Sequence, residues 1–555
     1  MGSSVYIPRT AKCLLVGPYD PDCGEYTFLA PPLGVWRLAG ALQSQGVDAQ
    51  VFDPNCCGPD VASAFEITLR SASWNLIGIS TTAMTLRYDL ALAHLARSLA
   101  PQAIIVAGGI EATFNPQRVF ELGPPFDLIV LGEGEKPLIE IAKRLVHRAD
   151  LAGIPGTALR TNDGGVARFH QIALTGEELS AAIHSTPYGQ MPYGRYWEKL
   201  ETAYEVRGLP YKAEREMRLA EIRSVRLITL NYCPMGCTFC SSTNYLHAAQ
   251  GSTARVARLS AEGCLAMLER IVAAHPGVRT IIFQDDIFAF TQDQRILPLC
   301  EQIVAAKARG QLPERLQFIS TNRIDAMTTE RLTAMRRAGF RVLGFGIENF
   351  SGSVLEEFNK GRIKRHIEPV LSSALRLGIT PFLDLILTSP RSTLCDLAEN
   401  VRQAQHWIEA GCEVGIYPYV IPFSGAPIAR DPSLEPYTEY EPTTVPGTSL
   451  AWRRATKILP ADPRTRDAIL AIEARFERAS RSIAGRVRHL PSRARSVVWL
   501  LAAQRVLAEI GHPIGAPQGT AVSAPSNASL ARRAAPARAR SASKAVRLPR
   551  DFAMA

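Results

Sequence analysis

The stretch NYCPMGCTFCSS, residues 231–242, spaces Cys233, Cys237 and Cys240 as C-x3-C-x2-C. It directly follows the apolar run VRLITL, residues 225–230, whose composition predicts a buried strand. The cysteines therefore belong to a loop at the C-terminal end of a strand. Three thiolates on one short loop can bind three irons of a [4Fe–4S] cluster, because cysteine thiolate is the usual ligand of such clusters. The fourth iron then stays open for a chelating small molecule.

A zinc ion is the alternative occupant of this cysteine loop. Tetrahedral zinc also takes cysteine and histidine ligands, but a structural zinc site needs four of them. The nearest candidate for the fourth ligand is His247, seven residues after Cys240. The two occupants differ in iron content, which a metal analysis measures directly.

Five further apolar runs follow the cysteine loop, and helical stretches separate them. The strand candidates after 225–230 are TIIFQDD (280–286), LQFIST (316–321), RVLGFGIE (341–348), TPFLDLIL (380–387) and EVGIYPYVI (413–421). Strands that alternate with helices form parallel β/α units, and six such units predict a partial (β/α)6 barrel. In barrels of this type the chemistry takes place at the C-terminal strand ends, which is where the cysteine loop lies.

The region before the barrel shows the same alternation. Strand candidates are KCLLVGP (12–18), DAQVFD (48–53), LIGIST (76–81), AIIVAGG (103–109) and DLIVLGEGE (127–135). This order predicts a doubly wound, Rossmann-like parallel sheet whose ligand lies beyond the C-terminal strand ends. The candidate ligand-binding residues at those ends are Ser80, Thr81, Thr82, Gly108, Gly109, Gly132, Glu133 and Gly134.

The chain has 555 residues, too many for one hydrophobic core, and we expect an α/β protein of several parts. The expected division is a first domain over 1–150, a less regular connector over 151–215, the barrel over 216–435, a helical C-terminal domain over 436–515 and a basic disordered tail over 516–555.

The net charge of +10 belongs to the C-terminal part of the chain. Residues 451–555 hold 20 Lys and Arg against six Asp and Glu, whereas residues 1–450 are mildly acidic. No aromatic residues alternate with the basic ones, so we do not expect nucleic acid as a partner. The N-terminus shows no secretory pattern and no run of about 18 apolar residues occurs, so we expect a cytoplasmic protein without a membrane span. The 11 cysteines then favour metal or redox chemistry over disulfides.

The cysteine loop and the strand ends that follow it resemble the radical S-adenosylmethionine (SAM) superfamily over residues 224–430. The resemblance implies that the open iron chelates SAM and that one-electron reduction cleaves it, with an electron donor such as flavodoxin or ferredoxin. It also implies that Phe239 lies by the adenine and that Asp285, Asp286 and Glu348 hold SAM. Arg323, in STNRID, is a further polar candidate. LTSPRST, residues 387–393, departs from the Gly-x-Pro-Gly-Glu-Thr loop that relatives often have.

The first domain resembles the cobalamin-binding domain that precedes many radical SAM cores. The resemblance rests on PPLGVWRLAGALQSQGVDAQVFDPN (31–55), STT (80–82), GGIEATF (108–114) and LGEGE (131–135). Its glycines permit a flat corrin ring to approach the backbone closely. Many cobalamin proteins ligate cobalt through an Asp-x-His-x-x-Gly loop, but the corresponding loop here, PYDPDCGEY (18–26), has no histidine. We therefore expect cobalamin bound with its base off and without a histidine ligand.

Together the two resemblances imply a cobalamin-dependent radical SAM methyltransferase that acts on an unactivated carbon, or phosphinate phosphorus, of a secondary metabolite, peptide or lipid. Cobalamin would carry a methyl group from one SAM molecule to a substrate radical made with a second. A non-methylating cyclase or rearrangement enzyme has the same architecture and stays open. An RNA methylthiotransferase would need a second cluster, for which Cys13, Cys23, Cys56 and Cys57 are available. A cobalamin sensor would leave the cysteine loop unexplained.

Overall fold

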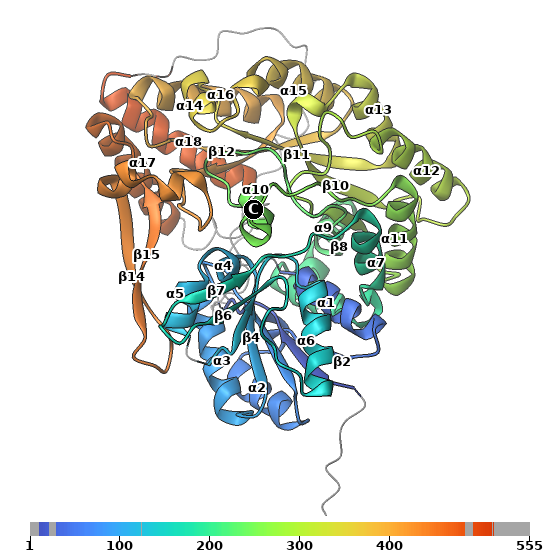
Figure 1. The fold of residues 1–555 in the computed structure, drawn as a ribbon. Helices are drawn as coiled ribbons and strands as arrows, with labels where there is room; N and C mark the ends of the chain where they lie inside the picture. Colours follow the sequence, from blue (N-terminus) through green and yellow to red (C-terminus); the bar gives the residue numbers. More distant parts are fainter. Residues whose placement is uncertain (1–9, 22–28, 124, 483–491, 513, 515–555) are drawn as a thin grey trace, which may run out of the picture.

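A computed structural model describes residues 10–21, 29–123, 125–482, 492–512 and 514. The loop expected to face cobalt is described as far as Pro21, and the basic tail 516–555 lies outside the described residues. Figure 1 shows two sheet-containing bodies, an N-terminal one below and a barrel-like one above, with helix α10 (Ser242–Gln250) between them.

The N-terminal body is the doubly wound sheet that the sequence predicts. Its strands have the order β2-β1-β3-β4-β5-β6-β7, and β1 to β5 are parallel. The strands are β1 (Lys12–Val16), β2 (Asp48–Phe52), β3 (Leu76–Ser80), β4 (Ile104–Gly108) and β5 (Leu128–Val130). Helices α1 (Leu33–Ser44) and α6 (Glu135–His147) share one apolar core with the sheet, and α2 (Val61–Arg70), α3 (Leu86–Leu99) and α5 (Pro116–Leu122) share another.

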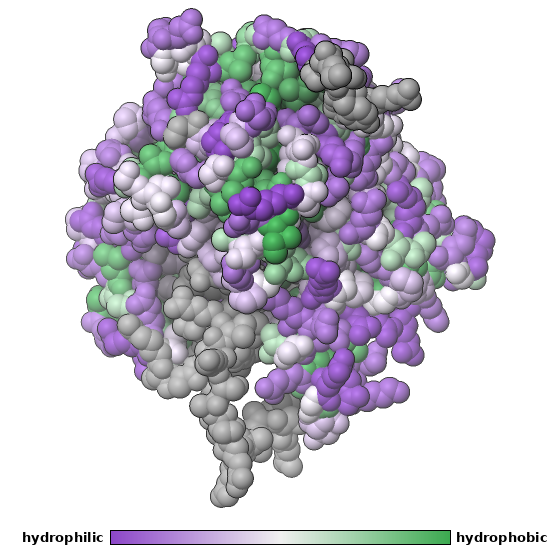
Figure 2. All heavy atoms as spheres, turned by 90° about the horizontal axis from the view of Figure 1, so that it is seen from below, coloured by the Kyte–Doolittle hydropathy of each residue, from purple (hydrophilic) through white to green (hydrophobic). Residues whose placement is uncertain are grey.

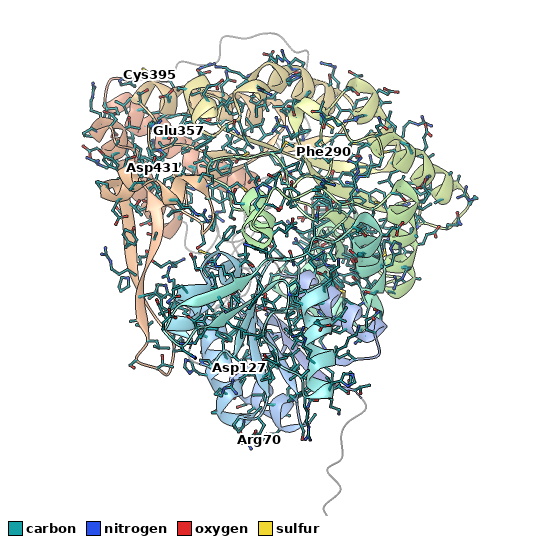
Figure 3. All side chains as sticks on the ribbon, viewed as in Figure 1. Arg70, Asp127, Phe290, Glu357, Cys395 and Asp431 are labelled. Carbon is teal, nitrogen blue, oxygen red and sulfur yellow. The ribbon has the colours of Figure 1, made fainter. Side chains whose placement is uncertain are left out.

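The C-terminal ends of β1 to β5 point toward the barrel. Asp127, just before β5, lies on the far side of this body, below the sheet in Figure 3. The short helix α4 (Ile110–Phe114) follows β4 on the near side and lies next to α10. The expected ligand face of the N-terminal sheet therefore faces the second body.

The segment 151–215 differs from the irregular connector that the sequence suggests. It contains the antiparallel strands β6 (Thr157–Arg160) and β7 (Val166–Phe169), which extend the N-terminal sheet beyond β5. Helices α7 (Gly176–Ser185), α8 (Tyr193–Ala203) and α9 (Lys212–Ile222) follow. A capping box between Thr175 and Glu178 starts α7, a signal present in the sequence that the density of Gly, Pro and Tyr obscured.

The second body is an open sheet of six parallel strands in the order β13-β12-β11-β10-β9-β8. These strands are β8 (Ser224–Leu227), β9 (Thr280–Phe283), β10 (Gln317–Asn322), β11 (Phe340–Glu348), β12 (Thr380–Ile386) and β13 (Glu413–Tyr417). The helices between them are α10, α11 (Ala261–Ala274), α12 (Ile296–Ala308), α13 (Thr329–Ala338), α14 (Gly352–Glu357), α15 (Ile367–Arg376) and α16 (Leu394–Ala410). The sheet curves as a partial barrel with helices on its outer side, which confirms the expected (β/α)6 architecture (Figure 1).

The C-terminal region is helical only in part. Residues 438–458, expected to be helical, form the antiparallel hairpin of β14 (Thr438–Thr444) and β15 (Ala451–Ile458), which reaches back to the N-terminal body. Helices α17 (Pro463–Ser482) and α18 (Ser492–Glu509) follow the hairpin. Side chains of α18 join the barrel core, and Ser496 donates a hydrogen bond to the carbonyl of Val414 in β13. The expected packing role of 497–510 is confirmed: α18 covers the barrel next to its last strand.

Within the described residues, no helix combines the length and the hydropathy that crossing a membrane requires. Seen from below, the surface is mostly hydrophilic, with hydrophobic side chains in small groups (Figure 2).

Candidate active site

The cysteine loop connects β8 to α10 and is held from its side by the segment that follows α14. Thr238 donates from its hydroxyl to the carbonyl of Glu357 at 2.8 Å, and the amide of Asn359 donates to the carbonyl of Gly236 at 3.0 Å. Glu357, labelled in Figure 3, marks the end of α14. Gly236 has φ +71°, a left-handed conformation that glycine adopts without strain. These hydrogen bonds hold the loop against the end of α14.

The three thiols lie close enough to influence one another. Burial above all, with the nearby charge of Asp286 and the other two cysteines, raises the pKa of Cys233 to about 12. Burial likewise raises the pKa of Cys237 and Cys240. Thiols in such a site ionise when they bind metal, since the metal replaces the proton.

The three cysteine side chains suit a [4Fe–4S] cluster better than a single metal ion such as zinc. Among the described residues, no three His, Cys, Asp or Glu side chains are arranged around one metal position. A [4Fe–4S] cluster does not require that arrangement, because each of the three thiolates binds a different iron. His247, the fourth ligand of the zinc alternative, packs edge-on against Tyr232 with ring centroids 5.7 Å apart.

The two aspartates that follow β9 have different surroundings. Asp285 is buried and accepts hydrogen bonds from the Thr229 amide, the Thr229 hydroxyl and the Leu230 amide at 2.6, 2.6 and 3.0 Å. It therefore holds the chain where β8 leads into the cysteine loop, and its expected role as a SAM acceptor is not supported. Asp286 has an exposed side chain, yet protein surrounds it closely enough to raise its pKa, an effect that the Ser242 hydroxyl opposes. Its charge acts on Cys233 and Cys240, so Asp286 borders the cluster position.

Arg323 and Glu348 are two further charged residues at the C-terminal ends of the barrel strands. Arg323 follows β10 and forms two hydrogen bonds of 2.7 Å with the carboxylate of Asp325. Glu348, the last residue of β11, forms an ion pair of 2.8 Å with Lys360. Lys360 also donates to the carbonyl of Gly346 at 2.7 Å. The charges of Arg323, Glu348 and Lys360 all act on the Cys237 thiol, which places them beside the cysteine loop.

Phe239 provides an apolar surface at the same place. Its ring centroid is 4.9 Å from that of Phe358, and the Lys360 ammonium lies 5.5 Å from it. Phe239 also packs against an apolar cluster that includes Ile386 at the end of β12. The aromatic ring, the cysteines and the carboxylates therefore share one site.

The sequence reasoning missed Lys360 and Asp384. Asp384 lies on β12, and its Oδ1 atom is buried without a hydrogen-bond partner. Burial raises the pKa of Asp384 well above its usual range, and the charge of Glu348 raises it further while Lys360 lowers it. A buried carboxyl oxygen without a partner is costly unless a ligand satisfies it. Only the alternation of inward and outward residues along 380–387 could have singled out Asp384, by placing a polar residue on the inner face.

The strand ends of the N-terminal sheet hold hydroxyl groups that already have partners. Thr81 is buried and donates to the carbonyl of Gly108 at 2.8 Å, while the Thr82 hydroxyl lies 2.8 Å from that of Thr85. Ser80 is half-buried beside them. A Cβ at Gly108 would make only ordinary van der Waals contact with Val130, 3.9 Å away, so crowding does not require glycine at the end of β4. Gly109, with φ +93°, packs closely on the Thr81 backbone instead.

The LGEGE segment serves the contact between the two bodies. A Cβ at Gly132 would lie 2.6 Å from Ala249 of α10, and Tyr245 of the same helix donates to the Gly132 carbonyl at 2.6 Å. Glu133 is buried here, and burial raises its pKa. The close approach expected of a corrin at Gly132 is therefore made by α10. Gly134 likewise packs against Leu38, since a Cβ there would lie 3.0 Å from that side chain.

Two family models match this chain, one in each body. A B12 binding domain model matches residues 20–142, and the radical SAM superfamily model matches residues 227–404. The chain contains a B12-binding domain followed by a radical SAM domain. Both expected resemblances are confirmed, as is the cofactor set of a [4Fe–4S] cluster, SAM and cobalamin.

Two curated relatives span most of this radical SAM protein. One is an uncharacterized methyltransferase of Pyrococcus horikoshii, 22% identical over 404 residues, which are 72% of this chain and 78% of the relative. Another is the anaerobic magnesium-protoporphyrin IX monomethyl ester cyclase of Cereibacter sphaeroides, 24% identical over 397 residues, 70% of this chain and 58% of the cyclase.

The fold agrees with a solved structure. The radical SAM methyltransferase TsrM from Kitasatospora setae, with cobalamin and a [4Fe–4S] cluster bound, superposes with a TM-score of 0.63 over 90% of this chain and 100% of its own, at 17% identity. This likeness confirms the order of a cobalamin-binding sheet followed by the radical SAM barrel.

The second-cluster alternative finds no support in the described residues. Cys13 is buried at the N-terminal end of β1, level with Ala49 of β2, whereas Cys56 and Cys57 come after the C-terminal end of β2. Cys23 lies outside the described residues. Cys13 therefore lies at the opposite end of the strands from Cys56 and Cys57.

Proposed function

We propose that this radical SAM enzyme is a cobalamin-dependent methyltransferase that methylates an unactivated carbon, or phosphinate phosphorus, of a small molecule, peptide or lipid. The main support is that helix α10 connects the cysteine loop of the barrel with the C-terminal strand ends of the B12-binding domain. The helix begins two residues after Cys240, and Tyr245 and Ala249 on it contact Gly132 at the end of the N-terminal sheet. When bound, the cluster supplies the electron that cleaves SAM, and cobalamin supplies the methyl group.

The residues of the barrel position SAM in this proposal. Cys233, Cys237 and Cys240 hold the cluster, and Asp286 accepts a hydrogen bond from the SAM ammonium next to it. Glu348, oriented by Lys360, accepts from SAM as well. The Asp384 carboxyl, whose buried Oδ1 atom has no partner and whose pKa burial raises, forms a hydrogen bond with SAM or substrate.

Two products distinguish methyl transfer from the other radical outcomes. With cobalamin, SAM and a one-electron donor such as flavodoxin or ferredoxin, a methyltransferase makes both S-adenosylhomocysteine and 5′-deoxyadenosine. We expect both, and with the true substrate we expect a labelled SAM methyl group in the product. Release of 5′-deoxyadenosine alone, with a product that carries no label, would reject methyl transfer and favour the cyclase reading that the Cereibacter sphaeroides relative raises.

Loss of the Glu348 charge should weaken SAM binding without loss of the cluster. A charge-assisted hydrogen bond contributes about 1.5–3 kcal/mol, so we expect Glu348→Gln to lower SAM affinity about ten- to hundredfold. Asp286→Asn should act in the same direction. Equilibrium binding of SAM to the reconstituted protein measures both. Glu356→Gln, at an exposed carboxylate of α14, is the control. Wild-type affinity in both Glu348→Gln and Asp286→Asn would refute the assignment.

Cobalamin should bind with its dimethylbenzimidazole off the cobalt and no histidine in its place. The loop 18–26 contains no histidine, and the histidines of residues 10–147, His94 and His147, lie in the middle of α3 and at the C-terminal end of α6. We expect the electron paramagnetic resonance spectrum of the cob(II)alamin form to lack nitrogen superhyperfine splitting. A clear three-line splitting from an axial nitrogen would contradict this expectation.

A further inference from the structure

We infer that a cavity between the B12-binding domain and the β14–β15 hairpin binds the phosphodiester of the cobalamin nucleotide loop, with Arg87 and Arg454 as its ligands. The inference rests on the proposed function. It adds a phosphate site that is partly supplied by the C-terminal hairpin, outside both of the regions that the family models match.

The cavity has a volume of about 110 Å³ and is mostly enclosed by polar and charged side chains. It is lined by Ala83, Met84, Arg87, Glu441, Pro442, Thr443, Trp452 and Arg454. A water molecule takes about 30 Å³ in the liquid, so the cavity has room for roughly three or four waters. That volume suits one phosphate group and is too small for a nucleoside or a corrin ring.

The charge of the cavity favours an anion. Arg87, from the first turn of α3, and Arg454, from β15, both line it. Arg87 also donates a hydrogen bond to the Tyr88 hydroxyl, and its guanidinium carbon lies 4.4 Å from the centre of that ring. The counter-charge is Glu441, 3.5 Å from Arg454, with a side chain that is 64% exposed. Such a surface pair is weak. Arg454 also donates from Nη1 to the sulfur of Met84 at 3.0 Å, and because a thioether is a weak acceptor, a phosphate oxygen can replace it. Guanidinium groups bind phosphate through paired hydrogen bonds, which a lysine cannot form.

A neighbouring cation strengthens the positive potential without lining the cavity. Arg118 of α5 lies with its guanidinium carbon 5.6 Å from the centre of the Trp452 ring. Because Trp452 is itself part of the cavity wall, this contact fixes the hairpin against the N-terminal domain. Val445, at the hairpin turn, belongs to the apolar core of that domain and anchors the hairpin a second time.

The cavity lies at the correct end of the N-terminal sheet for the tail of cobalamin. The loop that contains Met84 starts from the C-terminal end of β3, just after Thr82. Tyr88 packs edge-on against Tyr19, whose loop follows β1, with centroids 5.7 Å apart. β1 and β3 are neighbours where the strand order reverses, and open α/β sheets bind ligands in the crevice at this point. A nucleotide tail in that crevice passes the first turn of α3.

Comparison of cobalamin with cobinamide, which lacks the nucleotide loop, tests the site on the full-length protein. We expect Arg454→Gln to weaken cobalamin binding about ten- to hundredfold and to leave cobinamide binding unchanged. Arg87→Gln should show the same pattern from the other side of the cavity. Cobinamide phosphate should bind the wild type more tightly than cobinamide, because it restores the phosphate without the base.

The matched control is Arg453→Gln, because Arg453 is the exposed neighbour of Arg454 and contacts Tyr440 outside the cavity. It should leave both affinities unchanged. Thermal unfolding without ligand shows whether a variant has lost the hairpin.

Equal losses of affinity for cobalamin and for cobinamide in both Arg variants would show that these residues have only a structural role and would overturn the inference. A wild type that binds cobinamide as tightly as cobalamin would also overturn it, while cobalamin binding would stand. A wild type that binds neither would overturn both proposals.

Discussion

Anaerobically reconstituted protein in which Cys233, Cys237 and Cys240 are all Ala should show no iron–sulfur absorption and cleave no SAM. This is the largest effect that we expect, because no other described cysteine joins the loop between β8 and α10. The wild type should bind about four irons per chain. Removal of one thiolate leaves a cluster iron without its ligand, so each single variant should also lose most of its iron.

The control for the cysteine variants is Cys395→Ala. Cys395 is exposed near the start of α16, outside the cysteine loop, and is labelled in Figure 3. This variant should keep wild-type iron content and SAM cleavage. Stoichiometric zinc without iron in the anaerobically purified wild type would contradict the cluster assignment. So would a triple variant that still cleaves SAM.

Trp499→Ala should destabilise the protein by about 3–5 kcal/mol, since truncation of a buried tryptophan leaves a large cavity. Trp499 of α18 is only 7% exposed and stacks on Phe476 of α17, with ring centroids 4.2 Å apart and planes 15° from parallel. The same face of α18 packs into the barrel core through Leu500, Ala503 and Leu507. Chemical denaturation, followed by the loss of helical signal, measures the change.

Leu501→Ala provides the comparison within the same helix. Leu501 is 52% exposed, so its truncation should change the free energy of unfolding by no more than about 0.5 kcal/mol. Equal stability of the two variants would show that α18 does not pack on the barrel in solution.

The sequence predicts the six barrel strands well and the β14–β15 hairpin poorly, because the two differ in local residue composition. All six barrel strands come from apolar runs that a buried parallel strand requires. The 438–458 region instead contains Arg, Ala and Glu, which favour helix on average. Its strands are exposed along much of their length, so no apolar run marks them. The turn residues Pro446 and Gly447 between them were the available signal.

The cluster ligands could be predicted from the sequence because all three lie in one loop. The roles of the other site residues depend on tertiary contacts, so the sequence could not predict them. The cysteine spacing needs no fold to be recognised. Asp285 and Asp286 are adjacent in sequence, yet hydrogen bonds from Thr229 and Leu230 engage only Asp285. Lys360 lies 12 residues from Glu348 in the chain, so its ion pair depends on the turn after α14.

Helix α10 links the cysteine loop to the C-terminal end of the N-terminal sheet. It has nine residues, which at 1.5 Å per residue span about 13 Å. Its first turn adjoins the cysteine loop, while Tyr245 and Ala249 abut Gly132 at the opposite sheet. One inserted residue would turn Ala249 by about 100° around the helix axis and lengthen the spacer. Tyr245 and Ala249 lie one turn apart on one face of the helix, so this face couples the orientation of the cysteine loop to the C-terminal end of the N-terminal sheet.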